Sequence, residues 1–558
     1  MTASLEKADG DENISTPVAD HAVVPIQQTR RGLSPRHVQL MTIAGGFGVG
    51  LFVGVGGVLS KAGPLPLIIG YLIYGLGFIW PTMLNVAEMV AWLPIRGSIY
   101  ELASRFVDAA LGFAMGWIYF YAGAMLVCTE YSAVATVMQY WNTDINPAVW
   151  IAIALSFCYF MNMVAVRWYG EAEFIMGSTR ILLILGLIMA TFVTIVGGNP
   201  HHDAYGFRNW KNGDMAHEYY AEGATGIFLS ICICVRYAVF TIGGPDIISL
   251  SASEIRNPRK TIPKVAKLIV GRILFFYVVG SLLLASSATR VTLDFWVRLR
   301  TAKLAQQRLP GFWVFSVSIS EGFFLDSSTF SSCCLDAQDG QAPKIFLRCT
   351  KSGVPWVCVT AVTAISLLSF LVASASASEV FSWFLDFTTV ALVVKFTAMT
   401  WVFIGWCRAL KAQGITRQGE NNFKKSLFKK TSDRQPAPGI VFPYTAPCAS
   451  WTPYLCLFIG GSTSIFIRFD IFQPWSLKGF ITSYFGLAWF FFMFIFWKVF
   501  KRTKFVTPAT VDIFADGKKQ AVDEECRFWE EGFGDEAERD ALAKKHVIIR
   551  TWARFWGG

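Results

Sequence analysis

The chain of 558 residues is 54% apolar, 15% aromatic and only 16% charged, whereas a soluble protein carries about 25% charged residues. This composition excludes an ordinary soluble protein. The net charge of +10 does not indicate nucleic-acid binding, because the lysines and arginines fall mainly in loops and tails. Several apolar stretches exceed the roughly 18 residues that read as a membrane-spanning helix. The sequence therefore predicts an all-α integral membrane protein with one membrane domain.

The chain divides into three predicted parts. Residues 1–37 are a polar leader, low in aromatic residues, which we expect to be disordered and cytoplasmic. Residues 38–500 hold the membrane domain, and residues 501–558 form a cytoplasmic tail. The tail contains Phe528 and Phe533 among acidic residues, and a short amphipathic helix is one interpretation of it. The sequence shows no cleavable signal peptide, so we expect the first spanning helix to direct insertion.

Twelve apolar segments follow one another along the chain. They cover residues 38–60, 66–93, 111–141, 147–166, 174–197, 223–250, 267–288, 309–337, 355–376, 379–407, 453–472 and 479–497. Basic residues are concentrated before the first segment, after the sixth and after the tenth. Because cytoplasmic loops of membrane proteins are enriched in lysine and arginine, we expect both termini to be cytoplasmic.

The first segment is interrupted by glycine near its middle. Gly45, Gly46, Gly48 and Gly50 fall within six residues, and each costs a helix roughly 1 kcal/mol relative to alanine. One interpretation is close packing of neighbouring helices against small residues. The other is a broken helix whose freed amides face an anionic group at the centre of the membrane.

A second interruption favours the broken helix. In the sixth segment Gly243, Gly244 and Pro245 are consecutive, and Asp246 follows them. Proline cannot continue a helix, and an acid beside a break in a membrane helix is a candidate functional group. The predicted binding site comprises Gly45, Gly46, Gly48, Gly50, Phe240, Thr241, Gly243, Gly244 and Asp246.

Three further charged residues lie inside apolar segments: Glu130 in the third, Arg180 in the fifth and Arg236 in the sixth. Burial favours the protonated form of a carboxyl, so Glu130 and Asp246 are candidates to carry protons. Alternatively, Glu130 forms a structural pair with Arg180 or Arg236, and Asp246 caps the second half-helix. Arg180 is either a fixed cation for proton coupling or an arginine at the membrane interface. Arg236 is either a counter-ion or a residue that favours an acidic substrate.

A series of short motifs extends the pattern beyond the glycines. The motifs occupy residues 36–39, 51–54, 62–64, 88–89, 94–98, 105–108, 112–117, 166–171, 254–260, 339–344 and 409–414. In this order they resemble the fungal amino-acid permeases, the yeast amino acid transporter family of the APC superfamily. The resemblance covers residues from about 36 to 507. It departs at Val49, where the family has threonine, and at Asp246, where it has glutamate.

The resemblance implies a fold and a function. The fold has twelve helices: two inverted repeats of five, with helices 1 and 6 broken at the substrate site, and two C-terminal helices. The function is import of amino acids across the plasma membrane by proton symport and alternating access. The glycine amides would hold the substrate carboxylate, and carbonyls near the second break would hold its ammonium group. Phe240 matches a gating aromatic residue, and Arg180 aligns with a lysine of the family.

The implied partners are the amino-acid substrate, protons and the lipid bilayer. The energy source is the proton gradient, without a cofactor. The 12 cysteines show no metal-ligand spacing, and the chain contains no nucleotide-binding motif, so no enzyme is predicted. A sensor of the same fold that does not transport remains an alternative from the sequence.

Residues 290–336 depart from the pattern of their flanks. The beginning of this stretch is basic where an outer loop should hold few basic residues. The eighth segment contains Glu321 and Asp326 among serines, a composition that suits a lipid-exposed helix poorly. Similarity to the family stops near Ser286 and resumes at Ala337. We therefore predict an aberrant helix 8 that arises from a splicing or reading-frame error and, as a second alternative, a non-functional product. A divergent functional helix is the other interpretation of the stretch.

Overall fold

The computed structural model of the protein describes most of the predicted membrane domain. The described residues are 50–95, 97–141, 144–164, 169–198, 202–204, 206, 215–244, 246, 249, 252, 255, 257–287, 340–350, 354–415, 417, 442–472, 474–514 and 518–531. Within these ranges the side chains of several helical residues, Arg180 among them, lie outside the description. The predicted eighth segment, with Glu321 and Asp326, lies outside the described residues, as do the leader and the glycines at 45, 46 and 48.

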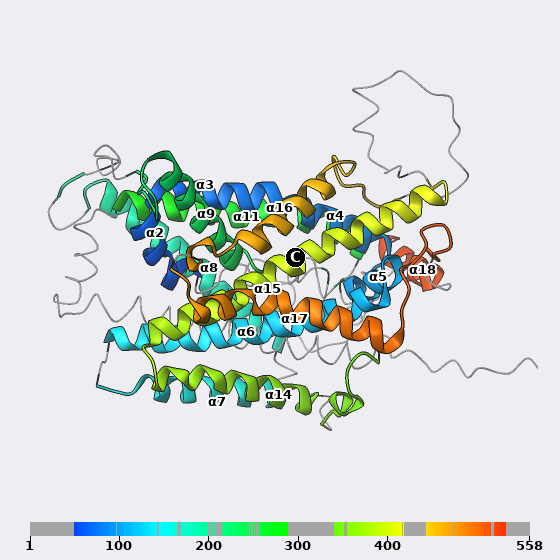
Figure 1. Ribbon diagram of the computed structural model, residues 1–558, viewed down its shortest axis with the longest axis horizontal. Helices are drawn as coiled ribbons and strands as arrows, with labels where there is room; N and C mark the ends of the chain where they lie inside the picture. Colours follow the sequence, from blue (N-terminus) through cyan, green and yellow to red (C-terminus); the bar gives the residue numbers. More distant parts are fainter. Residues whose placement is uncertain are drawn as a thin grey trace, which may run out of the picture.

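The described part of the chain is helical and contains no β-strand (Figure 1). In chain order its elements are η1 (Gly50–Gly54), α2 (Val55–Ala62), α3 (Pro64–Tyr74), η2 (Gly75–Ile79), α4 (Trp80–Trp92), α5 (Ser98–Phe106), α6 (Ala109–Trp141), α7 (Pro147–Val164), α8 (Tyr169–Ile195), α9 (Gly223–Thr241), α11 (Pro258–Ser287), η4 (Lys344–Leu347), α14 (Trp356–Ser366), η5 (Leu367–Ala373), α15 (Ala377–Ala412), α16 (Thr452–Phe466), η7 (Phe469–Ile471), α17 (Leu477–Lys501) and α18 (Lys518–Glu530).

The described residues contain eight helical spans that are long and apolar enough to cross a membrane, and α7 is a shorter apolar helix. Helices suit the apolar runs because in lipid every backbone N–H and C=O must find its partner within the segment. Each predicted segment except the first, the sixth and the eighth coincides with a described helix or with consecutive helices. The first is described from Gly50 onward, and the sixth is helical up to Thr241. The all-α, multi-pass membrane fold expected from the sequence is confirmed.

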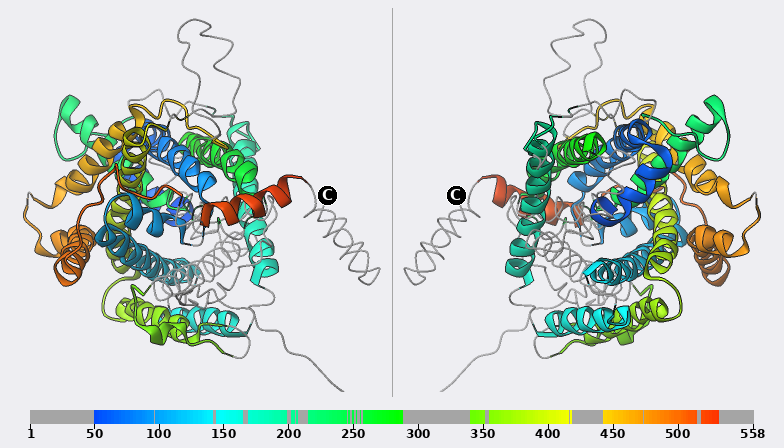
Figure 2. Two further views of the ribbon diagram at one scale, coloured as in Figure 1. Left: turned by 90° about the vertical axis from the view of Figure 1, so that its right-hand side faces the viewer. Right: turned by 90° about the vertical axis from the view of Figure 1, so that its left-hand side faces the viewer.

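Helix α15 is the central element of the described fold. In its most apolar stretch 83% of the residues are buried, compared with 22% in the corresponding stretch of α17 at the surface. It packs against α6, α16, α17, α4, α9 and α5, and Figure 1 shows it running along most of the length of the molecule. At the periphery α7 lies beside α14, as both figures of the whole molecule show (Figures 1 and 2). Asp386 and Lys395, in the middle part of α15, are therefore placed in the interior.

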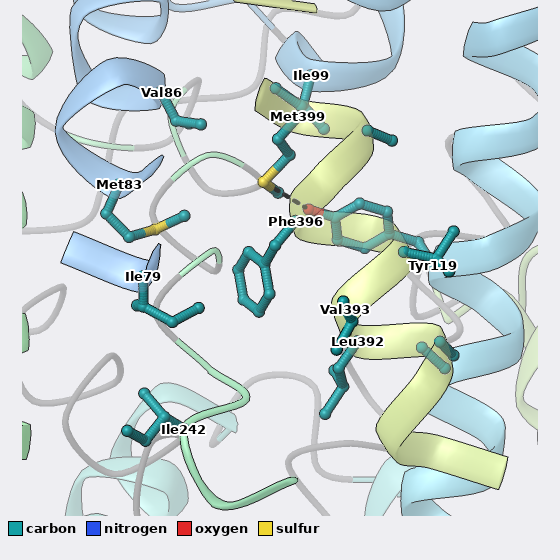
Figure 3. Packing of buried hydrophobic residues seen from close by; sticks show 14 of the residues in the cluster. Ile79, Met83, Val86, Ile99, Tyr119, Ile242, Leu392, Val393, Phe396 and Met399 are labelled. Carbon is teal, nitrogen blue, oxygen red and sulfur yellow. Dashed lines mark hydrogen bonds between the residues drawn. The ribbon is translucent and has the colours of Figure 1, made fainter. Parts of the chain in front are cut away.

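The core around α15 is tightly interlocked (Figure 3). Phe396 points from α15 into the space between Met83 of α4 and Tyr119 of α6. The Tyr119 hydroxyl donates to the sulfur of Met399, also on α15, at 3.8 Å. Phe396 and Met399 are fully buried. Methionine fills irregular gaps between helices, and this packing fixes the rotation of α15 about its own axis.

Two α-helices of the described residues lie outside the apolar segments. Helix α5 was not predicted. Helix α18 lies in the predicted tail, where a short amphipathic helix was one interpretation, and its Val522 is buried. Its Lys519 ammonium lies 3.9 Å from the ring centre of Trp92 in α4, and Asp523 pairs with Arg259 at the start of α11. The tail helix is thus attached to one end of the membrane bundle.

Adjacent glycines in α16 provide a test of the packing against α15. A Cβ atom at Gly460 would lie 2.8 Å from the ring of Phe78 and closer still to the Thr397 hydroxyl, whereas one at Gly461 meets no atom within 4 Å. We predict that Gly460→Leu lowers the free energy of unfolding by about 1–3 kcal/mol through overpacking, while Gly461→Leu has little effect. Thermal unfolding in detergent micelles measures both. Equal melting temperatures for the two variants would contradict the described α15–α16 contact.

Candidate functional site

Helix α9 stops inside the bundle. Its last residue is Thr241, and Ile242 has the non-helical angles φ −98° and ψ 58°. Gly243 and Gly244 have no regular structure, and the chain then turns at Asp246, whose carbonyl accepts from the Ser249 amide at 2.9 Å. A helix that ends within the membrane leaves carbonyls without helical partners. One of these, at Thr241, accepts from the Tyr277 hydroxyl of α11 at 2.7 Å.

The first glycine-rich segment meets this break. Gly50 begins the π-helix η1, and its carbonyl accepts from the Tyr237 hydroxyl of α9. A Cβ atom at Gly50 would collide with the Thr241 methyl group and lie 3.2 Å from ring atoms of Phe240. No side chain larger than hydrogen fits there without a shift, because the Gly50 backbone lies directly against the side chains of Thr241 and Phe240. The two interrupted segments therefore lie against each other at Gly50.

Asp246 forms an ion pair that was not predicted. The Lys395 ammonium of α15 lies 2.7 Å from its carboxylate, and the two side chains are only 7% and 4% exposed. Two aromatic residues of different helices, Tyr74 of α3 and Tyr119 of α6, also lie close enough to the Asp246 carboxylate to interact with it electrostatically. The counter-ion of this acid is therefore a lysine from α15, and Arg236 has a different partner.

Arg236 belongs to a second buried cluster. It pairs with Asp386 of α15 rather than with Glu130, and Asp386 also pairs with Arg468, which follows α16. The Arg468 Nε atom lies 2.8 Å from the carboxylate of Asp470. The cluster joins the first part of the sixth segment to α15 and to the end of α16. The expectation that Arg236 could pair with Glu130 is corrected accordingly.

The remaining proton-coupling candidates differ in how far they are described. Glu130 is 1% exposed in the middle of α6, next to Thr129, whose hydroxyl lies 3.3 Å from that of Thr388 in α15. Glu130 is thus buried within α6, one of the two most buried described spans. Arg180 belongs to α8, and its side chain lies outside the described residues.

A small cavity opens beside the second break. Apolar side chains from α4 and α11 form most of its wall, and Asp246 is the only charged residue among the described residues that line it. The lining residues are Met83, Val86, Ala87, Val90, Asp246, Ser249, Ile262 and Ala266. The cavity is smaller than the roughly 300–1,000 Å³ of a typical ligand site, so it is no substrate site by itself.

The sequence contained a signal for the charged residues that were missed. Lys395 and Asp386 both lie inside the apolar segment predicted at 379–407, and Arg468 lies inside the one at 453–472. The same criterion that singled out Glu130, an ionisable residue within a membrane segment, identifies all three. Their pairing could not be read from the sequence, because it depends on which faces of α9, α15 and α16 meet.

Comparison with known protein families finds a match that covers most of the chain. The family model described as amino acid permease matches residues 37–297 and 314–432. The match includes residues 290–297 and 314–336, so the expectation that similarity is lost throughout 290–336 is wrong; within that stretch only residues 298–313 are unmatched. A proline-specific permease of Emericella nidulans is 33% identical over 94% of this chain and 94% of its own length.

Other relatives carry different substrate names. A dicarboxylic amino acid permease of Saccharomyces cerevisiae is 29% identical over 94% of this chain and 85% of its own. A lysine-specific permease of the same organism is 28% identical over 95% and 82%. A solved structure, a manganese transporter of Eremococcus coleocola, matches with a TM-score of 0.52 at 11% identity, covering 86% of this chain and 98% of that one. This last similarity concerns the fold alone.

The Asp386 cluster provides a stability test. We predict that Asp386→Ala lowers the free energy of unfolding by about 3–5 kcal/mol, because Arg236 then stays buried without its carboxylate. In the matched control, Glu379→Ala breaks a pair with Lys478 whose side chains are 49% and 56% exposed, and such surface pairs contribute at most about 1 kcal/mol. Thermal unfolding in micelles compares the two. Similar melting temperatures would show that the cluster does not hold α9 and α15 together.

Proposed function

The chain belongs to the amino acid permease family, and we propose that it is a secondary active transporter that imports amino acids by proton symport and alternating access. The multi-pass helical membrane fold suits a carrier. The proposed location is the plasma membrane with both termini in the cytoplasm, on the distribution of lysine and arginine in the loops.

The observation that supports this function best is the contact of the glycine-rich first segment, at Gly50, with the end of α9 at the second break. The ends of half-helices offer amide donors and carbonyl acceptors in the interior of the membrane. A free amino acid carries a carboxylate and an ammonium group, and these two charges need such donors and acceptors. Gly50 brings the first segment to Phe240 and Thr241, which precede the second break, and we propose that groups of both segments reach one molecule. The other glycines of the proposed site, at 45, 46, 48, 243 and 244, flank this contact in the sequence.

We propose that two buried acids couple transport to protons. Asp246 follows the second break, and Glu130 is buried in α6, which has the most extensive contact with α15 among the described helices. A carboxyl within a membrane bundle can bind a proton on one side and release it on the other. Such a transporter uses the proton gradient and needs no cofactor.

Alternating access is proposed to proceed by movement at the breaks. Gly243 and Gly244 give the second break backbone freedom, and the Arg236 and Asp246 ion pairs attach the two sides of it to α15 separately. The part before the break can therefore move relative to the part after it while one of the two ion pairs with α15 is kept. The sensor and the non-functional product that the sequence left open are not favoured by the comparisons, which name permeases.

Uptake by cells that lack their own permeases tests the proposal. We predict saturable uptake of at least one of labelled proline, glutamate and lysine that rises as external pH falls and makes the medium more alkaline. Glu130→Gln and Asp246→Asn should each reduce uptake or flatten its pH dependence, because an amide cannot exchange a proton. Glu379→Gln is the control for a surface acid. Wild-type rates and pH profiles in both buried variants would assign these acids a structural role.

Gly50 allows a separate test of the binding site. We predict that Gly50→Leu abolishes uptake while the protein still reaches the cell surface, because the side chain would occupy the contact between the two breaks. Gly56→Leu is the matched control, since a Cβ atom at Gly56 meets no atom within 4 Å. Uptake and surface labelling are measured on the same cells. Normal uptake kinetics in the Gly50 variant would place the substrate elsewhere.

A further inference from the structure

Lys395 is a charged residue in the most buried helix of the described fold. Its side chain is 7% exposed, and its neighbours along α15, Val394 and Phe396, are buried apolar residues. An isolated ammonium at such a place costs a large free energy unless an anion neutralises it. Packing alone would be served by an apolar side chain of similar volume. The charge of this lysine therefore requires an explanation of its own.

The surroundings of Lys395 provide one anion and two aromatic faces. The anion is Asp246, 2.7 Å away. The ring centres of Tyr119 and Phe396 lie 4.8 Å and 5.0 Å from the ammonium nitrogen, within the range of cation–π attraction. Lys395 thus has a second, weaker environment in which its charge is partly stabilised when the carboxylate is not available.

The groups that face Asp246 come from several elements. Lys395 of α15 is the cation, and the phenols of Tyr74 in α3 and Tyr119 in α6 are the other titratable groups that interact with it. From α4 and α11 the described residues beside it are apolar, Val86 and Ile262 among them. Lys395 is therefore the nearest described charge that can stabilise ionised Asp246.

We propose that Lys395 is the coupling residue of the proton step: its ammonium pairs with ionised Asp246 in the form seen here and releases it when Asp246 binds a proton. This inference rests on the proton symport proposed above. The inference adds Lys395 as a residue that acts on Asp246. It also explains why the proton is released, because the ammonium stabilises the ionised carboxylate.

The step is a simple proton exchange. On the outer side, a proton from water forms an O–H bond with the Asp246 carboxylate, and the ion pair is lost. Lys395 keeps its own proton and its charge, held against the rings of Tyr119 and Phe396. On the inner side, the O–H bond breaks, the proton passes to water, and the ammonium pairs with the carboxylate again. One proton enters for each cycle, and no other group is oxidised or reduced.

Without Lys395 the release step should fail. A carboxyl buried among apolar groups without a cation holds its proton more tightly. Asp246 would then stay protonated on the inner side, and the transporter could not return in its deprotonated form. Exchange of external for internal substrate needs no release of the proton, so it should continue. Loss of net transport with retained exchange distinguishes a coupling role from a structural one.

The full-length protein in proteoliposomes is the system for the test. The probe is the labelled amino acid, out of proline, glutamate and lysine, that wild type takes up fastest. Accumulation is driven by an imposed proton gradient, and exchange is measured without a gradient against the same amino acid inside. We expect Lys395→Gln to lower accumulation about tenfold or more and to retain exchange. Lys395→Arg keeps the charge and should retain both activities. Lys478→Gln, at an exposed pair, is the control.

Three results would overturn the inference. They are proton-driven accumulation by Lys395→Gln at the wild-type rate, loss of exchange together with accumulation in that variant, and failure of Lys395→Arg to restore accumulation. If Lys395→Gln does not fold, the pair of variants D246N and D246N/K395Q decides. Exchange should be faster in the double variant, where no cation is left unpaired, and equal exchange in the two would contradict the pairing. Wild-type vesicles without accumulation or exchange would instead refute the proposed function itself.

Discussion

A charge inside a membrane bundle must be neutralised by a partner within a few ångströms, and this requirement shapes the region around the helix breaks. Helix α15 supplies the partners. Asp386 near its beginning holds Arg236, which lies before the second break, and Lys395 further along holds Asp246, which lies after it. The two anchors lie nine positions apart on the helix, or about 13.5 Å along its axis. A continuous helix thus serves as the support for an interrupted one.

Close approach of helices at glycines is the second constraint on the same region. Gly50 lies against Thr241 and Phe240, and Gly70 of α3 lies against the backbone of Cys234 in α9. Both contacts bring α9 nearer to its neighbours than any larger residue would allow. The sixth segment is therefore held by ion pairs on the side of α15 and by glycine contacts on the side of the first segment and α3.

The positions of the helices followed from the sequence because a long apolar run in lipid has hardly any other choice than a helix. The break after Thr241 followed from Gly243, Gly244 and Pro245, since glycines weaken a helix and proline lacks the N–H group that would continue the hydrogen-bond ladder. The partners of the charged residues did not follow. Asp246 is separated from Lys395 by 149 positions in the chain, and only the rotation of α15, set by residues such as Phe396, brings them together.

The described charges around the breaks balance one another. Arg236, Arg468 and Lys395 carry three positive charges, and their partners Asp386, Asp470 and Asp246 carry three negative ones. A voltage across the membrane exerts no net force on such a set. Once a bound ion adds a charge, the voltage contributes a free energy of about 2.3 kcal/mol for each elementary charge moved through 100 mV. Because the ion pairs around α15 are neutral as a set, the membrane voltage acts on the charge of the ions that the carrier binds.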